Sequence, residues 1–280
     1  MLKKAYVEIT NCCNLRCSFC PGTRREKRVM RAEEFAAVLD RLAGYVRFVY
    51  LHVMGEPLSH PALAEILSAA AQRDMRVCIT TNGTLLAAQR ETLLAAGALH
   101  KVSISLHSFE GNGNAPEAQE AYLAAVWDFA EEAAKRGVLI ALRLWNEGGL
   151  EEQNAAILAY LLQRAGLDAL PPLKNGSAVL AERIFLERAQ KFDWPDLSAP
   201  PQETEFCRGL RDQIGILADG TVVPCCLDHE GDLALGNIFT QPLDEILQGP
   251  RAAAIREGFS RRTPAEELCR RCGYAARFTK

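Results

Sequence analysis

The chain has 280 residues, of which 49% are hydrophobic and 24% charged, and its formal net charge is −3. These values fit a globular protein with a substantial core, and they leave no overall charge that would favour nucleic acid or a membrane surface. No apolar run approaches the length of a signal-peptide core or a membrane span, so we expect a cytoplasmic protein. Because disulfides are rare in a reducing compartment, the ten cysteines indicate metal or redox chemistry.

The first predicted strand, residues 5–10, leads directly into a cysteine array. Cys13, Cys17 and Cys20 have the spacing C-x3-C-x2-C on one short loop. Three thiolates suit three corners of a cubic [4Fe–4S] cluster and leave one iron open to another ligand. A zinc site and a disulfide framework are the alternatives. Zinc motifs usually consist of paired C-x2-C units, and disulfide scaffolds are short secreted chains, so the sequence favours the cluster.

Strands and helices then alternate along the chain. The basic stretch at residues 24–28 is typical of a solvated surface. Apolar periodicity predicts helices over residues 33–43, 61–73, 85–96, 118–136 and 150–165. Further strands are predicted over residues 47–53, 76–81, 101–106, 138–145 and 183–187. The alternation predicts an α/β fold, a partial (β/α)6 TIM-like barrel, and a doubly wound sheet is the alternative.

The strand at residues 101–106 is predicted to have two different faces. Val102 and Ile104 alternate with serines, so the apolar set is expected under the helices and the polar set in the barrel lumen. The segment at residues 108–117 is polar and rich in glycine, and it is expected to be an irregular loop that covers the substrate.

The strand at residues 47–53 ends in the turn Met54-Gly55-Glu56-Pro57. This turn and the cysteine array together resemble the signatures of the radical S-adenosylmethionine (SAM) enzymes. In that family the amino and carboxylate groups of SAM chelate the open iron, and one electron cleaves the sulfonium to give a 5′-deoxyadenosyl radical. Met54 departs from the family pattern, because it replaces the first glycine of the turn.

The resemblance also implies which residues contact the cofactor. The residues implied in SAM binding are Phe19, Gly55, Glu56, Pro57, Ser105 and Arg143. The phenyl ring is expected against adenine, the turn approaches the amino group, and the last two residues are candidates for the ribose and the carboxylate. His107 is a candidate base for a substrate hydroxyl, because imidazole titrates near neutral pH, and Glu187 is an alternative base.

The C-terminal part has a composition of its own. Proline and aromatic residues cluster at residues 192–201 and divide the chain into predicted domains of residues 1–198 and 199–280. A β-hairpin is predicted to turn at Asp219-Gly220. A helix is expected over residues 243–258.

Four cysteines of this second domain fit a fully ligated cluster. Their layout resembles the twitch domain, the short form of the SPASM extension, in which cysteines flank a hairpin and a C-x2-C pair completes an auxiliary [4Fe–4S] site. The ligands that this resemblance implies are Cys207, Cys225, Cys269 and Cys272, and Cys226 competes for the second position. A structural zinc ion with four cysteines is the alternative.

These features predict a radical SAM iron–sulfur oxidoreductase. The overall spacing is similar to twitch-type dehydrogenases that oxidise an aminocyclitol alcohol, in which the auxiliary cluster accepts the electron lost by the substrate radical. We therefore expect oxidation of a small polar substrate or of a side chain in a peptide. Modification or crosslinking of a ribosomally made peptide is a close alternative, and a non-catalytic, metal-stabilised RNA-binding module is a second. The resemblance also implies an electron donor of the flavodoxin or ferredoxin type.

Overall fold

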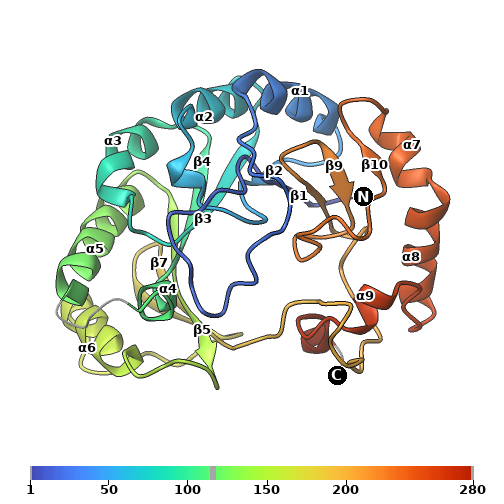
Figure 1. Cartoon of the computed structure of the whole chain (residues 1–280). Helices are drawn as coiled ribbons and strands as arrows, with labels where there is room; N and C mark the ends of the chain where they lie inside the picture. Colours follow the sequence, from blue (N-terminus) through green and yellow to red (C-terminus); the bar gives the residue numbers. More distant parts are fainter. Residues whose placement is uncertain (1, 114–117, 279–280) are drawn as a thin grey trace.

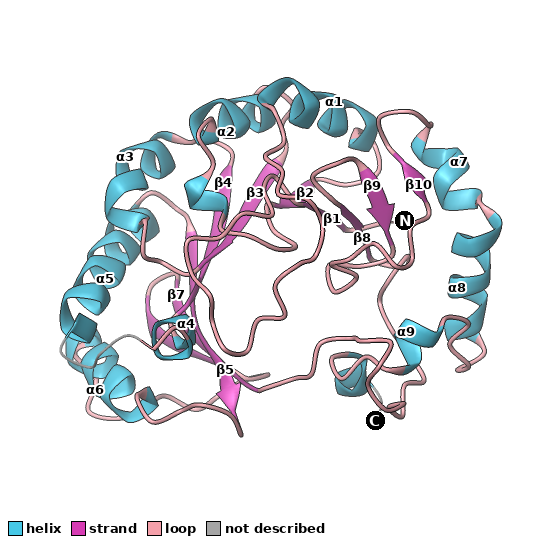
Figure 2. Cartoon of the chain, viewed as in Figure 1, coloured by secondary structure: helices cyan, strands magenta, loops and turns pink. Residues whose placement is uncertain are grey.

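Helices form an arc around the outside of a curved sheet (Figure 1). The structure is a computed structural model that describes residues 2–113 and 118–278. Figure 2 shows the strands inside the arc, with α1, α2, α3, α5 and α6 on the outer face. Helices on one face are typical of a barrel, whereas a doubly wound sheet carries helices on both faces. The predicted partial barrel is therefore confirmed.

Within the described residues, the strands form one 10-stranded sheet in the order β10-β9-β8-β1-β2-β3-β4-β5-β7-β6. The run from β8 through β1 to β7 is parallel, and the pairs at both edges are antiparallel. The strands are β1 (Lys4–Val7), β2 (Phe48–Tyr50), β3 (Arg76–Thr81), β4 (Leu99–Ser105), β5 (Leu139–Glu147), β6 (Ser177–Ala181), β7 (Ile184–Gln190), β8 (Gln213–Ile216), β9 (Thr221–Val223) and β10 (Gly236–Asn237).

The helices that cover the sheet agree with the predicted ones to within a few residues in the first half of the chain. They are α1 (Ala32–Leu42), α2 (Leu63–Ala71), α3 (Leu86–Ala95), α4 (His107–Gly111), α5 (Gln119–Lys135), α6 (Asn154–Ala165), α7 (Leu243–Gln248), α8 (Pro250–Ser260) and α9 (Glu267–Arg270), with short 3₁₀ turns η1 (Pro57–Ser59) and η3 (Ala275–Phe278). None of the helices in the described part of the chain combines the length and apolarity that crossing a bilayer requires.

The two faces predicted for the fourth strand are confirmed in β4. Val102 and Ile104 are fully buried in the core, which also contains Trp127 and Phe129 of α5. Ser105, on the other face, lines an inner cavity. Burial of each large apolar side chain contributes about 1.5–3 kcal/mol. This alternation therefore fixes which face of the strand meets the helices.

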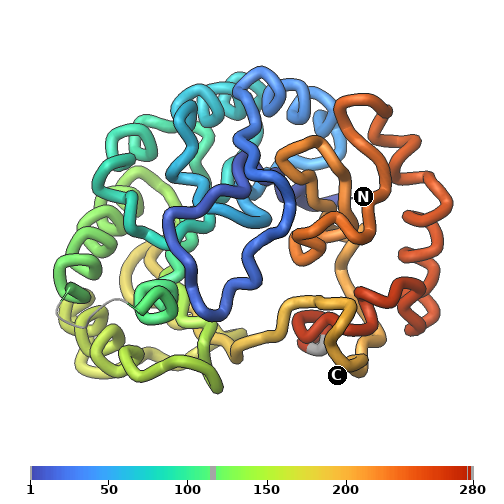
Figure 3. Tube along the Cα trace, in the orientation of Figure 1, coloured from blue at the N-terminus to red at the C-terminus, as the bar shows by residue number. Residues whose placement is uncertain are grey.

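The C-terminal hairpin extends the barrel sheet. β8 and β9 form the predicted antiparallel hairpin, and the turn between them contains Gly220 with a φ of +86°. β8 also pairs in parallel with β1, with Lys4 opposite Gln213 and Val7 opposite Ile216. Figure 3 shows the orange hairpin beside the blue N-terminal segment. The composition change that suggested a domain boundary therefore does not interrupt the sheet.

Two elements of the second half differ from the prediction. The helix expected over residues 243–258 is two helices, because Pro250 cannot donate a backbone hydrogen bond and begins α8 after Gly249. β6 was not predicted; it is an antiparallel edge strand that pairs with β7.

The loop expected over residues 108–117 is also partly wrong. Residues 107–111 form the short helix α4, and residues 114–117 lie outside the described part of the chain. The first strand ends at Val7 instead of continuing to residue 10. From Glu8 onward the backbone turns toward the segment around Met30. The Met30 N–H donates a hydrogen bond to the Ile9 carbonyl at 2.9 Å.

Candidate functional site

A cavity of about 340 Å³ lies inside the barrel. Three separate parts of the chain supply its wall. The cysteine loop contributes Cys13, Cys17, Phe19 and Cys20; the strand ends contribute Thr80, Ser105 and Arg143; the C-terminal segment contributes Cys226, Leu227 and Tyr274. The three cysteines of the predicted SAM-binding cluster and most of the predicted SAM contacts therefore face one space.

The cysteine loop is held in place by α4 and the segment that follows it. Ser18 N–H donates to the Gly111 carbonyl at 2.7 Å, and Arg16 N–H donates to Asn112 Oδ1 at 2.9 Å. A Cβ on Gly111 would lie 2.4 Å from the Phe19 ring, so only glycine allows this approach. The segment predicted to cover substrate thus supports the cluster loop.

The Gly55 turn packs directly against the same loop. Gly55 has a φ of +77°, and a Cβ there would lie 2.3 Å from the Thr10 carbonyl oxygen. Glu56 N–H donates to the Cys12 carbonyl at 2.8 Å. Met54 is buried, and its N–H donates to Glu8 at 3.1 Å. The residue that departs from the family pattern is therefore accommodated without displacing the turn.

The Glu56 carboxylate is buried and strongly oriented. Its side chain is 2% exposed, and Oε1 accepts from Leu58 N–H at 3.0 Å and from the Thr81 hydroxyl at 2.8 Å. Oε2 accepts from Asn82 N–H at 2.8 Å. Burial raises the pKa of Glu56, although these donors oppose the shift. Gly55 and Glu56 line the cavity, whereas Pro57 is buried at the start of η1.

Arg143 and Glu187 form an ion pair on neighbouring strands β5 and β7. Arg143 Nε lies 3.0 Å from Glu187 Oε2, and Lys101 Nζ lies 2.8 Å from Oε1. Burial raises the pKa of Glu187, but the two cations outweigh it and hold that pKa below its usual value. A carboxylate held by two cations is a poor proton acceptor. These two cations favour a role for Glu187 in orienting Arg143 over its predicted role as a base.

His107 lines the cavity as the first residue of α4, and its ring lies 4.9 Å from that of Phe19. Nδ1 is 3.1 Å from the Arg143 carbonyl oxygen, which fits an N–H donor at that nitrogen. Burial lowers the pKa of His107 to about 4, so the ring is neutral at neutral pH. It is a weaker base than the sequence suggested, because imidazole was expected to titrate near pH 7.

The C-terminal cysteines gather around a second, much smaller space. Cys207, Cys225, Cys269 and Cys272 all line a void of about 30 Å³. Its remaining wall is mostly apolar and includes Leu233, Phe259 and Leu268. Cys226 lines the large cavity instead. These two adjacent cysteines thus line different spaces. This arrangement favours Cys225 over Cys226 as the second of the four predicted auxiliary ligands.

The number of cysteines at each site bears on which metal centre it could hold. Zinc needs all its thiolates about 2.3 Å from a single point. A cubic cluster offers each thiolate a different iron. Three cysteines at one site and four at the other match such clusters in ligand number and softness.

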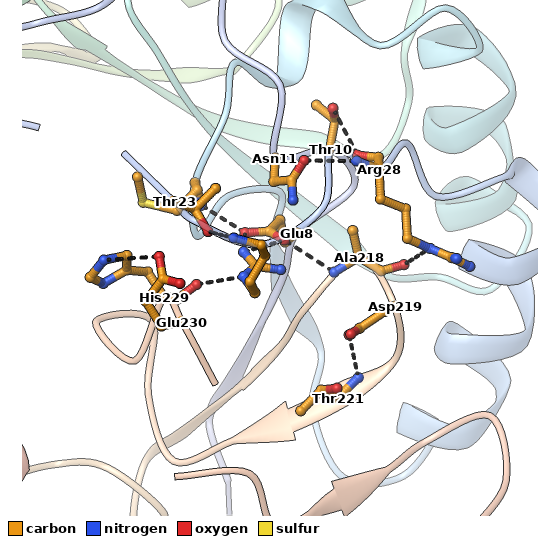
Figure 4. Close-up of polar contacts among 12 residues, drawn as sticks. Glu8, Thr10, Asn11, Thr23, Arg28, Ala218, Asp219, Thr221, His229 and Glu230 are labelled. Carbon is orange, nitrogen blue, oxygen red and sulfur yellow. Dashed lines mark hydrogen bonds and ion pairs between the residues drawn. The ribbon is translucent and has the colours of Figure 1, made fainter. Parts of the chain in front are cut away.

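A buried ion pair that the sequence did not predict joins the cysteine loop to the C-terminal segment. Glu8 is fully buried, and its two oxygens lie 2.9 and 2.7 Å from Arg25 Nη2. The same carboxylate accepts from the N–H groups of Met54 and Ala218, each at 3.1 Å. One side chain therefore connects the loop, the Gly55 turn and the C-terminal hairpin, and Figure 4 shows its contact with Ala218.

The prediction of a solvated basic stretch at residues 24–28 is consequently wrong for Arg25, whose side chain is 15% exposed, whereas the Arg28 side chain is 40% exposed. Arg25 Nε donates to the His229 carbonyl at 2.7 Å, and Arg28 Nε donates to the Ala218 carbonyl at 2.8 Å. Glu230 accepts from Arg24 N–H at 3.0 Å. One signal was present in the sequence: Glu8 lies between two apolar neighbours in the predicted strand, where a buried carboxylate would need a partner.

Comparison with known proteins agrees with this geometry. A model of the radical SAM superfamily matches residues 7–146, half of the 280-residue chain. A second model, of an iron–sulfur cluster-binding domain named SPASM, matches residues 207–273.

Several curated proteins are similar over part of their length. GTP 3′,8-cyclase from Chlorobaculum tepidum is 34% identical over 112 residues, which cover 37% of this chain and 32% of the cyclase. Fe-coproporphyrin III synthase from Methanosarcina barkeri is 27% identical over 198 residues, 65% of this chain and 48% of the synthase. PqqA peptide cyclase from Granulibacter bethesdensis is 28% identical over 193 residues, 67% of this chain and 47% of the cyclase. The chain spans less than half of the length of each of these relatives.

Solved structures with the same fold cover almost the whole chain. BtrN in complex with AdoMet and 2-DOIA superposes with a TM-score of 0.63 at 18% identity, over 97% of this chain and 93% of BtrN. Streptococcus suis SuiB bound to its precursor peptide SuiA superposes with a TM-score of 0.58 at 17% identity, over 98% of this chain and 70% of SuiB.

Proposed function

The chain belongs to the radical SAM superfamily and carries a SPASM iron–sulfur domain, and from this premise we propose that it is a radical SAM oxidoreductase. It takes a hydrogen atom from a substrate and completes the oxidation with an auxiliary cluster as electron acceptor. Its substrate is a small molecule or a peptide side chain. The structural neighbours are of both kinds, since one complex holds 2-DOIA and another a precursor peptide.

The observation that carries this proposal is the convergence of three elements on one cavity. Cys13, Cys17 and Cys20 supply thiolates, the Gly55 turn supplies backbone and carboxylate groups, and Arg143 supplies a cation. When bound, the first cluster and SAM supply the radical that removes hydrogen, and the auxiliary cluster accepts the electron that the substrate then loses.

The residues that surround the cavity have separable roles in this proposal. Glu56 receives the amino group of SAM, because a buried carboxylate with three fixed donors is a preorganised anionic partner. Arg143, held by Glu187, receives the carboxylate of SAM. Phe19 packs against adenine, and Ser105 lies within the same wall for the ribose.

The C-terminal cysteines have no comparable open space. We assign Cys207, Cys225, Cys269 and Cys272 to the auxiliary cluster, because they share one small apolar void. A fully ligated cluster in such surroundings exchanges electrons without binding substrate. His107 remains a candidate for taking the substrate proton, although its burial makes it a weak base.

The test is anaerobic reconstitution with iron and sulfide, reduction with dithionite, and assay of 5′-deoxyadenosine by mass spectrometry. We expect cleavage of SAM that requires the reductant. A protein that binds both clusters but never produces 5′-deoxyadenosine would contradict the proposed function. It would favour the non-catalytic alternative instead.

A further inference from the structure

The cavity wall formed by β5, the segment at residues 191–194 and the C-terminal tail consists largely of aromatic rings. Protein cations already occupy the faces of several of these rings. The Trp145 ring has the Arg143 guanidinium at 4.5 Å and the Arg277 guanidinium at 5.4 Å. Arg277 also lies 5.1 Å from the Phe192 ring and 4.8 Å from the Tyr274 ring.

The same arrangement recurs at the base of the cavity. Lys4 Nζ lies 5.1 Å from the centre of the Tyr6 ring and 4.9 Å from that of Tyr50, and both rings line the cavity. An aromatic ring attracts a cation through the negative potential of its face. Because Lys4, Arg143 and Arg277 already use these faces, a cationic substrate would find positive charge behind the rings.

Acidic groups do not balance this charge. Among the described residues that line the cavity, Glu56 is the one carboxylate, and in the proposed function its charge is matched by the amino group of SAM. Glu187 is shared between Lys101 and Arg143. The wall opposite the cysteine loop therefore carries an excess of positive charge.

One cation of this wall is available to a ligand. Lys191 lines the cavity at the end of β7, and its side chain is exposed. None of the ion pairs found within the described part of the chain involves its ammonium group. Its neighbour Gln190 accepts a hydrogen bond from Arg277 through its carbonyl, so the two cations lie along the same short segment.

We propose that the substrate of this enzyme carries a carboxylate, bound by Lys191, on a planar or apolar body that lies against Trp145, Phe192 and Tyr274. This inference rests on the proposed function and specifies its substrate. A single unpaired lysine on a wall that also carries apolar rings matches a monoanion with an apolar body. An aminocyclitol fits poorly, because its ammonium groups would meet cations on this wall and no free carboxylate.

Three small molecules that share one ring and differ in charge test the proposal. They are 4-hydroxyphenylacetate, an anion; 4-hydroxyphenylacetamide, which is neutral; and tyramine, a cation. Each is titrated calorimetrically into the full-length reconstituted protein with SAM bound. We expect the anion to bind at least tenfold more tightly than the amide and tyramine to bind most weakly. Raising the salt concentration should weaken the binding of the anion more than that of the neutral amide.

Variants connect this preference to one side chain. K191Q should reduce the anion-to-amide ratio to below threefold, K191R should retain it, and K135Q, which removes an exposed lysine of α5, should leave it unchanged. Three results would overturn the proposal: an anion no tighter than the amide, whether both bind or neither does; tyramine as the tightest ligand; or a preference that K191Q leaves intact.

The same preparations separate this inference from the proposed function. Production of 5′-deoxyadenosine is measured in the wild type and in K135Q. Missing cleavage contradicts the radical SAM activity itself. Cleavage without a preference for the anion contradicts the substrate assignment and leaves the activity in place.

Discussion

The two cysteine sites of this chain differ in what surrounds their ligands. Cys13 and Cys20 are exposed on a loop that borders a cavity of about 340 Å³. Cys272 is 8% exposed, and the void that it shares with Cys207, Cys225 and Cys269 is about 30 Å³. The first site has three thiolates and room for a large ligand. The second has four thiolates and almost no room.

This difference separates two kinds of iron–sulfur chemistry. An iron without a protein ligand can bind a molecule only if space remains beside it. A cluster with four cysteines in an apolar pocket is protected from solvent, and burial and hydrogen bonding tune its potential. In the proposed function, the same ligand type therefore serves catalysis at one site and electron transfer at the other, and the surrounding residues determine which role each cluster has.

The largest effect is expected when the three cysteines beside the large cavity are removed and the C-terminal cysteines are kept. Replacing Cys13, Cys17 and Cys20 by alanine should abolish SAM cleavage. About four irons and four sulfides per chain should remain on the C-terminal cysteines. Metal and sulfide analysis together with 5′-deoxyadenosine assays measures both outcomes, and C12A is the matched control. Zinc in place of the remaining iron would refute the electron-acceptor role.

The closed site is tested by two adjacent cysteines. C225A should lower the iron content toward about four per chain, because it removes a ligand of the auxiliary cluster. C226A should keep about eight, since Cys226 faces the large cavity. Iron analysis and electron paramagnetic resonance of the reduced proteins compare the two. If the resonance of the auxiliary cluster persists in C225A and is lost in C226A, Cys226 is the ligand in place of Cys225.

The connection between the sites is tested at Glu8. E8A leaves the Arg25 guanidinium buried without its partner, which costs about 3–5 kcal/mol of stability. The thermal midpoint should fall by roughly 10 °C. The double variant E8M/R25M should recover part of this loss, because no charge is left unpaired, and the exposed E26A should change little. If E8A leaves the thermal midpoint unchanged, the Glu8–Arg25 pair does not contribute to the stability of the fold.

A smaller effect is expected within the open site. E56Q keeps the shape of the side chain but removes its charge, and it should weaken SAM binding by about tenfold, the value of one charge-assisted hydrogen bond. Equilibrium dialysis with labelled SAM gives the dissociation constant, and E91Q on the exposed face of α3 is the control. If E56Q binds SAM as tightly as the wild type, Glu56 does not bind the amino group of SAM.

The sequence predicted most of the barrel because its signals are local. Strand and helix periods place residues within a few positions of each other, as in β3, where the expected bounds of residues 76–81 are confirmed. One failure involved a distant partner: the glycine-rich segment after β4 forms α4, and its Gly111 packs closely against Phe19 of the cysteine loop. The other was a local signal that was overlooked, because Pro250 divides the helix expected over residues 243–258.

The sequence by itself determined the cysteine spacings, the Gly55 turn and the family to which the chain belongs, because each is a pattern of nearby residues. Only the tertiary structure shows that Cys225 and Cys226 line different spaces, that Arg25 pairs with Glu8, and that Arg143 and Lys191 line the large cavity. Burial and charge pairing depend on which distant segments meet. Glu8 and Ala218, joined by a hydrogen bond across 210 positions, lie far outside any sequence window.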